Sequence, residues 1–66
     1  MKIDADKWYS SRQAATQLGV TEETIKRYCR EGSLEAKQVG PKKRWHVHGR
    51  AILMKRKEWR LDEIAN

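Results

Sequence analysis

The sequence predicts a single small α+β domain, in which two short helices precede a two-stranded hairpin and a short C-terminal helix or strand. Its 66 residues suffice for one domain with a modest core. Two segments begin with helix-capping signals and end at glycine, Gly19 and Gly32. A Gly-Pro pair at residues 40–41 then divides two segments that contain β-favouring residues.

The first helix is expected over Ser11–Leu18. Ser10 and Gln13 have the spacing of a capping box, in which the hydroxyl accepts from the amide at the third helical position and the glutamine reaches back. Gly19 suits the left-handed conformation that ends a helix. The apolar face of this helix consists of Ala14, Ala15 and Leu18.

A second helix is expected from Thr21, its N-cap, to Glu31, with Gly32 ending it. Val20 and Ile25 have the spacing of a hydrophobic staple across this start. Acidic residues occupy the first turn and a basic residue lies near the last, as the helix dipole favours. The turn between the two helices is about three residues long, which is typical of a helix-turn-helix.

Residues 33–40 and 44–47 are expected to form two short strands. Proline has no amide for a strand ladder, so Gly40-Pro41-Lys42-Lys43 belongs at the hairpin tip. Beyond the hairpin the apolar residues scatter around a helical wheel, and we expect a short helix or a third strand within residues 50–57. We expect a flexible leader at residues 1–7, a folded domain at residues 8–57 and a C-terminal tail at residues 58–66.

The second helix combines a narrow apolar stripe with a basic face. Ile25, Tyr28 and Cys29 form the stripe, and the opposite face carries donors at a spacing that suits a DNA major groove. An isolated basic face is more often a solvated surface, but its place on the second helix, before a basic hairpin, favours DNA contact. The DNA contacts expected from this helix are Thr21, Glu22, Glu23, Thr24, Lys26, Arg27 and Arg30.

The hairpin tip is cationic and is interpreted as a wing that reaches phosphates or an adjacent groove. Its expected contacts are Lys42, Lys43 and Arg44. A solubilising turn is the alternative, and Arg44 could instead fold back along Trp45. We also expect DNA contacts from the start of the first helix, at Ser10, Ser11 and Arg12.

Composition narrows the class of protein. The formal charge of +6 and the pI near 9.8 fit nucleic acid or an anionic membrane surface, and charge alone does not choose. One cysteine allows no internal disulfide framework and is compatible with a reducing cytoplasm. There is no apolar run of the roughly 20 residues that span a bilayer, nor a signal-peptide stretch near the start. We therefore expect a cytoplasmic protein with no membrane partner.

No residue pattern indicates catalysis. The sequence has no evident nucleophile–base set and no Gly-rich phosphate loop, so we expect no enzyme activity and no cofactor. His46 and His48 would share a strand face, but a metal site needs more ligands than two, and none is expected.

The tryptophans leave alternatives open. Trp8, Trp45 and Trp59 could stack on bases, although a core position is favoured for Trp45 in so small a domain. The basic residues around Trp59 could contact DNA, bind a protein partner or be solvated.

The segment YSSRQAATQLGVTEETIKRYCREGSLEAKQVGPKKRWHV resembles the MerR-like winged helix-turn-helix family, and particularly the excisionases of phages and mobile elements. That family shows an aromatic residue, a capping Ser or Thr, paired alanines before Leu-Gly-Val, and later Val-Gly and Arg-Trp in the hairpin. The residues in register with this pattern are Ala14, Ala15, Leu18, Gly19, Val20, Thr21, Thr24, Ile25, Arg27, Gly32, Leu34, Val39, Gly40, Arg44 and Trp45.

The resemblance implies a recognition helix over Thr21–Glu31 and a wing at Gly40–Lys43. It also implies a phage or bacterial factor that binds adjacent DNA sites cooperatively, bends the duplex and helps an integrase to excise an element. Its expected partners are double-stranded DNA, an integrase and neighbouring copies of itself. The sequence departs from the family after the second strand, where His48-Gly49 and a basic segment replace a Pro and an acidic helix. The alternatives are a small transcriptional regulator of a mobile element and a basic protein-interaction adaptor.

Overall fold

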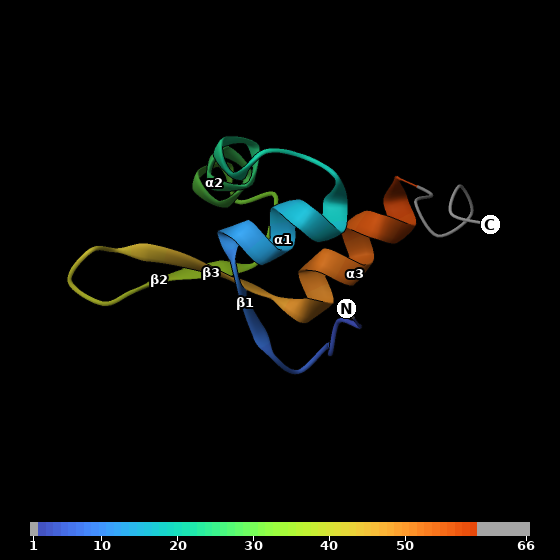
Figure 1. Cartoon of the computed structure of the whole chain (residues 1–66), viewed down its shortest axis with the longest axis horizontal. Coiled ribbons are helices and arrows are strands. Elements are labelled where there is room, and N and C mark those ends of the chain that lie inside the picture. Colours follow the sequence, from blue (N-terminus) through green and yellow to red (C-terminus); the bar gives the residue numbers. More distant parts are fainter. Residues whose placement is uncertain (1, 60–66) are drawn as a thin grey trace.

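The computed structural model, which describes residues 2–59, combines three helices with a three-stranded antiparallel sheet. The predicted fold class, a small α+β winged helix-turn-helix, is confirmed. Figure 1 shows the hairpin of the second and third strands projecting beyond the helices. The elements in chain order are β1 (Trp8–Ser10), α1 (Ser11–Leu18), α2 (Glu22–Glu31), β2 (Ala36–Val39), β3 (Arg44–His48) and α3 (Gly49–Glu58).

Both helices of the helix-turn-helix begin and end where their capping residues predict. The Ser10 hydroxyl accepts from the Gln13 amide at 3.1 Å, while the Gln13 side chain accepts from the Ser10 amide at 3.1 Å. The Thr21 hydroxyl accepts from the Thr24 amide at 3.2 Å and starts α2. Gly19 ends α1 in the left-handed region, at a φ of 69°. Local capping therefore determines both helix boundaries.

The sheet contains β1 as its third strand, at a position where the sequence predicts none. β3 lies in the middle and pairs with β2 on one side and β1 on the other. Tyr9 of β1 is buried opposite Val47 of β3, whereas its neighbour Trp8 is exposed. β1 thus supplies the support that an isolated hairpin lacks. The wing turn closes with the Lys43 amide donating to the Gly40 carbonyl at 3.1 Å.

The segment after the hairpin is a helix rather than a strand. His48 caps α3, because the Arg50 amide donates to its Nδ1 atom at 3.3 Å. Gly49 fits tightly here: its amide donates to the Lys7 carbonyl at 2.7 Å, and a Cβ would overlap the Asp4 carbonyl. α1 contacts both α2 and α3 (Figure 1), so the three helices share one core. Its fully buried large side chains are Ile25, Val47 and Ile52.

Residues 2–7, which the sequence predicts as a flexible leader, contact the folded domain in the structure. Ile3 is only 6% exposed and belongs to the core. The Asp4 amide also donates to the Tyr9 hydroxyl at 2.7 Å. Ile3 lies between charged residues in the sequence, so no apolar pattern there predicts its burial. The tail predicted at residues 58–66 lies outside the described residues from residue 60 onward.

Within residues 2–59, no helix is both long enough and apolar enough to cross a membrane.

Candidate nucleic-acid interface

A concave surface of about 660 Å³ opens between the start of α1, the start of α2 and the wing. We call it the basic groove. Its lining has five Lys or Arg side chains and one Glu, an excess of four positive charges. The residues that line it are Ser10, Ser11, Arg12, Glu22, Lys26, Lys42, Lys43, Arg44, Trp45 and His46.

The fold brings these three chain segments together by short connections. Ser10 both ends β1 and caps α1, and its strand position lies opposite His46 of β3. The start of α1 is therefore held against the base of the wing. On α2, Glu22 and Lys26 are one helical turn apart and line the same side of the groove. The groove thus presents side chains from both helices and the hairpin to one partner.

Eight of the thirteen predicted contact residues line the groove, from Ser10, Ser11 and Arg12 through Glu22 and Lys26 to the three wing residues. The other five, Thr21, Glu23, Thr24, Arg27 and Arg30, do not line it.

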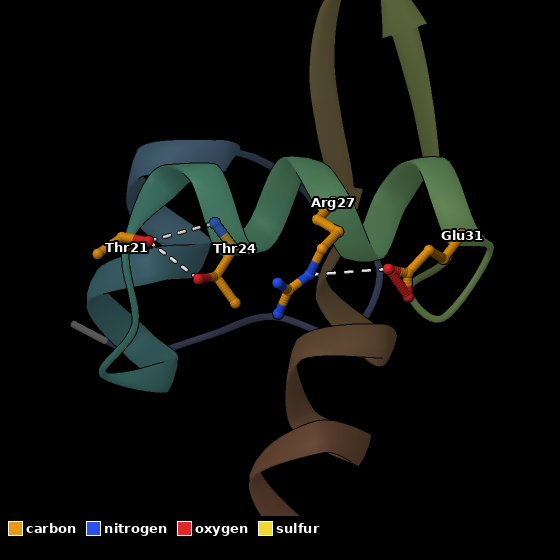
Figure 2. A network of polar contacts seen from close by, with 4 residues as sticks. All are labelled: Thr21, Thr24, Arg27 and Glu31. Atoms are coloured by element: carbon orange, nitrogen blue, oxygen red, sulfur yellow. Dashed lines mark hydrogen bonds and ion pairs between the residues drawn. The ribbon is translucent and has the colours of Figure 1, made fainter.

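Two of these five, Thr21 and Thr24, form the start of α2. Their hydroxyls are 2.9 Å apart, and the Thr21 hydroxyl also accepts from the Thr24 amide (Figure 2). Both side chains therefore have a structural role in capping.

Arg27 lies on the flank of α2 rather than in the groove. Its Nε is 3.7 Å from a carboxylate oxygen of Glu31, and its guanidinium carbon is 5.5 Å from the centre of the Tyr28 ring. Figure 2 shows Arg27 and Glu31 on the same side of the helix as Thr21 and Thr24. Glu23 and Arg30 are exposed on α2 outside the groove.

Trp45 and His46 also line the groove, although neither is among the thirteen predicted contact residues. Trp45 is half-buried and packs against the core, as predicted, yet it also lines the groove. The signal available in the sequence was their place directly after Arg44, at the base of a cationic hairpin. His48, in contrast, is used as the α3 cap. Among residues 2–59, no three His, Cys, Asp or Glu side chains gather as metal ligands would.

Residues at the end of α3 contact both α1 and α2. The rings of Trp59 and Tyr28 meet edge to face, with centres 6.0 Å apart. The Lys55 ammonium pairs with Glu58 at 3.2 Å, and Arg56 donates to the Gln17 side chain at 3.0 Å. These two cations therefore have partners within the chain. Trp8 also has a partner within the chain, since the Lys37 ammonium lies 4.4 Å from its ring centre in a cation–π contact.

Cys29 is buried on the inner side of α2. Burial raises the pKa of its thiol, against a smaller lowering by the neighbouring Arg30 charge. The residue therefore acts as a small core side chain and not as a reactive thiol.

A family model described as "Helix-turn-helix domain" matches residues 8–58 of the chain. The matched segment includes every residue of the basic groove. Comparison with curated proteins and with solved structures finds no match.

Proposed function

The chain belongs to the helix-turn-helix domain family, whose fold binds DNA, and from this premise we propose that it is an excisionase-type architectural factor. Such a factor binds specific double-stranded sites that adjoin one another, does so cooperatively and bends the duplex. It thereby directs an integrase toward excision of a mobile element. In this role the protein acts by binding and carries out no reaction itself.

The basic groove is the observation that carries this proposal. A recognition helix must present side chains to base edges while neighbouring elements hold the phosphates. Lys26 faces the groove from α2, Arg12 from the start of α1, and Lys42 from the wing. Three elements thus offer cations to one duplex, and this arrangement can fix both the register and the orientation of the protein.

The charge of the groove sets an upper limit on its electrostatic binding. If all five Lys and Arg side chains replace counterions on phosphates, the logarithm of the binding constant should fall with the logarithm of the salt concentration at a slope of about −4.5. Side chains that read bases will reduce this slope. A strong salt dependence is therefore expected for binding to duplex DNA.

Cooperative binding follows from the small size of the domain. A single module buries roughly 600–1,000 Å² on DNA, which gives limited selectivity against very many non-specific sites. Contacts between neighbouring copies supply additional free energy. Two apolar side chains of α3 are available for them, since Leu53 is 36% and Met54 is 58% exposed. Bending costs on the order of 1–6 kcal/mol, which several copies gripping phosphates together can offset.

The test is a titration of one site against tandem sites, with a circular-permutation mobility assay for bending. We expect tighter binding per site on the tandem duplex and a mobility that depends on site position. Equal affinity per site and a straight duplex would refute the architectural role. That result would leave the second candidate, a small transcriptional regulator that uses the same groove.

A further inference from the structure

The basic groove contains one acidic side chain, Glu22. It lies in the first turn of α2, one turn before Lys26. The ion pairs of Lys or Arg with carboxylates within residues 2–59 join Arg27 to Glu31 and Lys55 to Glu58, and neither involves Glu22. Its carboxylate is therefore exposed to the groove without a paired cation.

A free carboxylate in this position has a cost for DNA binding. It repels the phosphates that the surrounding Lys and Arg side chains attract. Glu22 also interacts favourably with the α2 dipole, but Glu23 makes the same interaction from the same turn outside the groove, so the dipole alone does not require an acidic residue inside it. An acceptor that faces the DNA could offset the repulsion through a hydrogen bond to a base.

We propose that Glu22 is a specificity-determining residue that accepts a hydrogen bond from the N4 amino group of a cytosine. Carboxylates are the side chains that read this donor in the major groove, and the first turn of a recognition helix is the part that reaches base edges. Lys26, about 5–6 Å away along the helix face, lies within about two base steps of 3.4 Å each. The inference rests on the proposed DNA-binding role of the groove.

The repulsive cost also contributes to selectivity. On a duplex without cytosine at that position, Glu22 loses its hydrogen-bond donor and keeps its repulsion from the phosphates. Affinity for wrong sites therefore falls while the correct site is spared. Removing the Glu22 charge should therefore lower the affinity for the specific site and raise the affinity for random duplex.

The experiment compares the unmodified chain with Glu22→Gln and Glu23→Gln. Preferred sequences are selected from a randomised duplex library, and affinities are then measured for the selected site and its single-base variants. We expect the unmodified chain to select a cytosine that Glu22→Gln no longer prefers, with a loss of about tenfold or more in discrimination there. Glu22→Gln should also bind random duplex more tightly.

Glu23→Gln is the matched control, because it removes the same charge from the same helical turn. It should keep the cytosine preference, and circular dichroism should show equal helix content for both variants. An unchanged base preference in Glu22→Gln would overturn the inference. Selection of adenine by the unmodified chain, at the position whose preference depends on Glu22, would overturn it as well. If the unmodified chain itself selects no sequence, the proposed specific DNA binding fails instead.

Discussion

Replacing Lys26 with alanine isolates the contribution of α2 to DNA binding. The side chain lines the groove, and alanine is the best helix former, so the variant should fold with a stability change within about 0.5 kcal/mol. A charge about 4 Å from a phosphate contributes roughly 1 kcal/mol in water and up to about 4 kcal/mol near a protein surface. The groove is open to solvent, which favours the lower part of that range.

We therefore expect Lys26→Ala to weaken binding to the selected site by about 1–3 kcal/mol, or roughly 5- to 150-fold. Its base preference should also relax near the Lys26 contact. Fluorescence anisotropy with the selected and a scrambled duplex, at several salt concentrations, measures both effects. Lys57→Ala is the control, since Lys57 is exposed on α3 outside the groove. Equal losses for the two variants would refute the placement of α2 in the major groove.

Three further predictions concern the wing, the leader and α3. Replacing Lys42 and Lys43 together with alanine should lower the affinity for specific and for random duplexes equally, and should reduce the salt slope by about 0.9 per lost phosphate contact. A loss of affinity for the specific site alone would contradict this prediction. Ile3→Ala should destabilise the domain by about 2–5 kcal/mol in thermal or denaturant unfolding. Unchanged stability would instead support the flexible leader that the sequence predicts. His48→Ala should lower the free energy of unfolding by about 1 kcal/mol, because α3 loses its cap, and His48→Asn should lower it by less. His46→Ala is the control, because His46 is not a helix cap. Equal stability of all three variants would show that His48 does not stabilise α3 as a cap.

Features set by neighbouring residues could be predicted from the sequence. The boundaries of α1 and α2 depend on Ser10, Thr21 and the glycines that follow each helix, and all of these act within one or two turns. The hairpin turn depends similarly on Gly40 and Pro41. These local signals agree with one another, which is typical of a foldable sequence.

Features set by distant contacts could not be predicted. β1 is only three residues long and pairs with β3 across more than thirty residues of chain. Ile3 becomes a core residue only because β1 folds back onto that strand. α3 shows no apolar stripe because Ile52 is its one large buried side chain. Its other buried residues, Gly49 and Ala51, are small.

The candidate site was predicted in part for the same reason. The helical wheel separates the buried and exposed sides of α2 correctly but cannot say which exposed flank the wing approaches. The wing approaches Glu22 and Lys26 and leaves Arg27 on the other flank, beside Tyr28. Trp45 is both a core contact and a groove residue, a double role that an inside–outside pattern does not describe.

The most direct test of the basic groove as the DNA-binding surface is an amide chemical-shift titration of the full chain with its selected duplex. If DNA binds in the basic groove, the largest changes fall on residues 10–12 at the start of α1, on α2 near Glu22 and Lys26, and on residues 42–46 of the wing. Changes centred on α3, with unchanged amides in the groove residues, would show that the groove is not the DNA-binding surface.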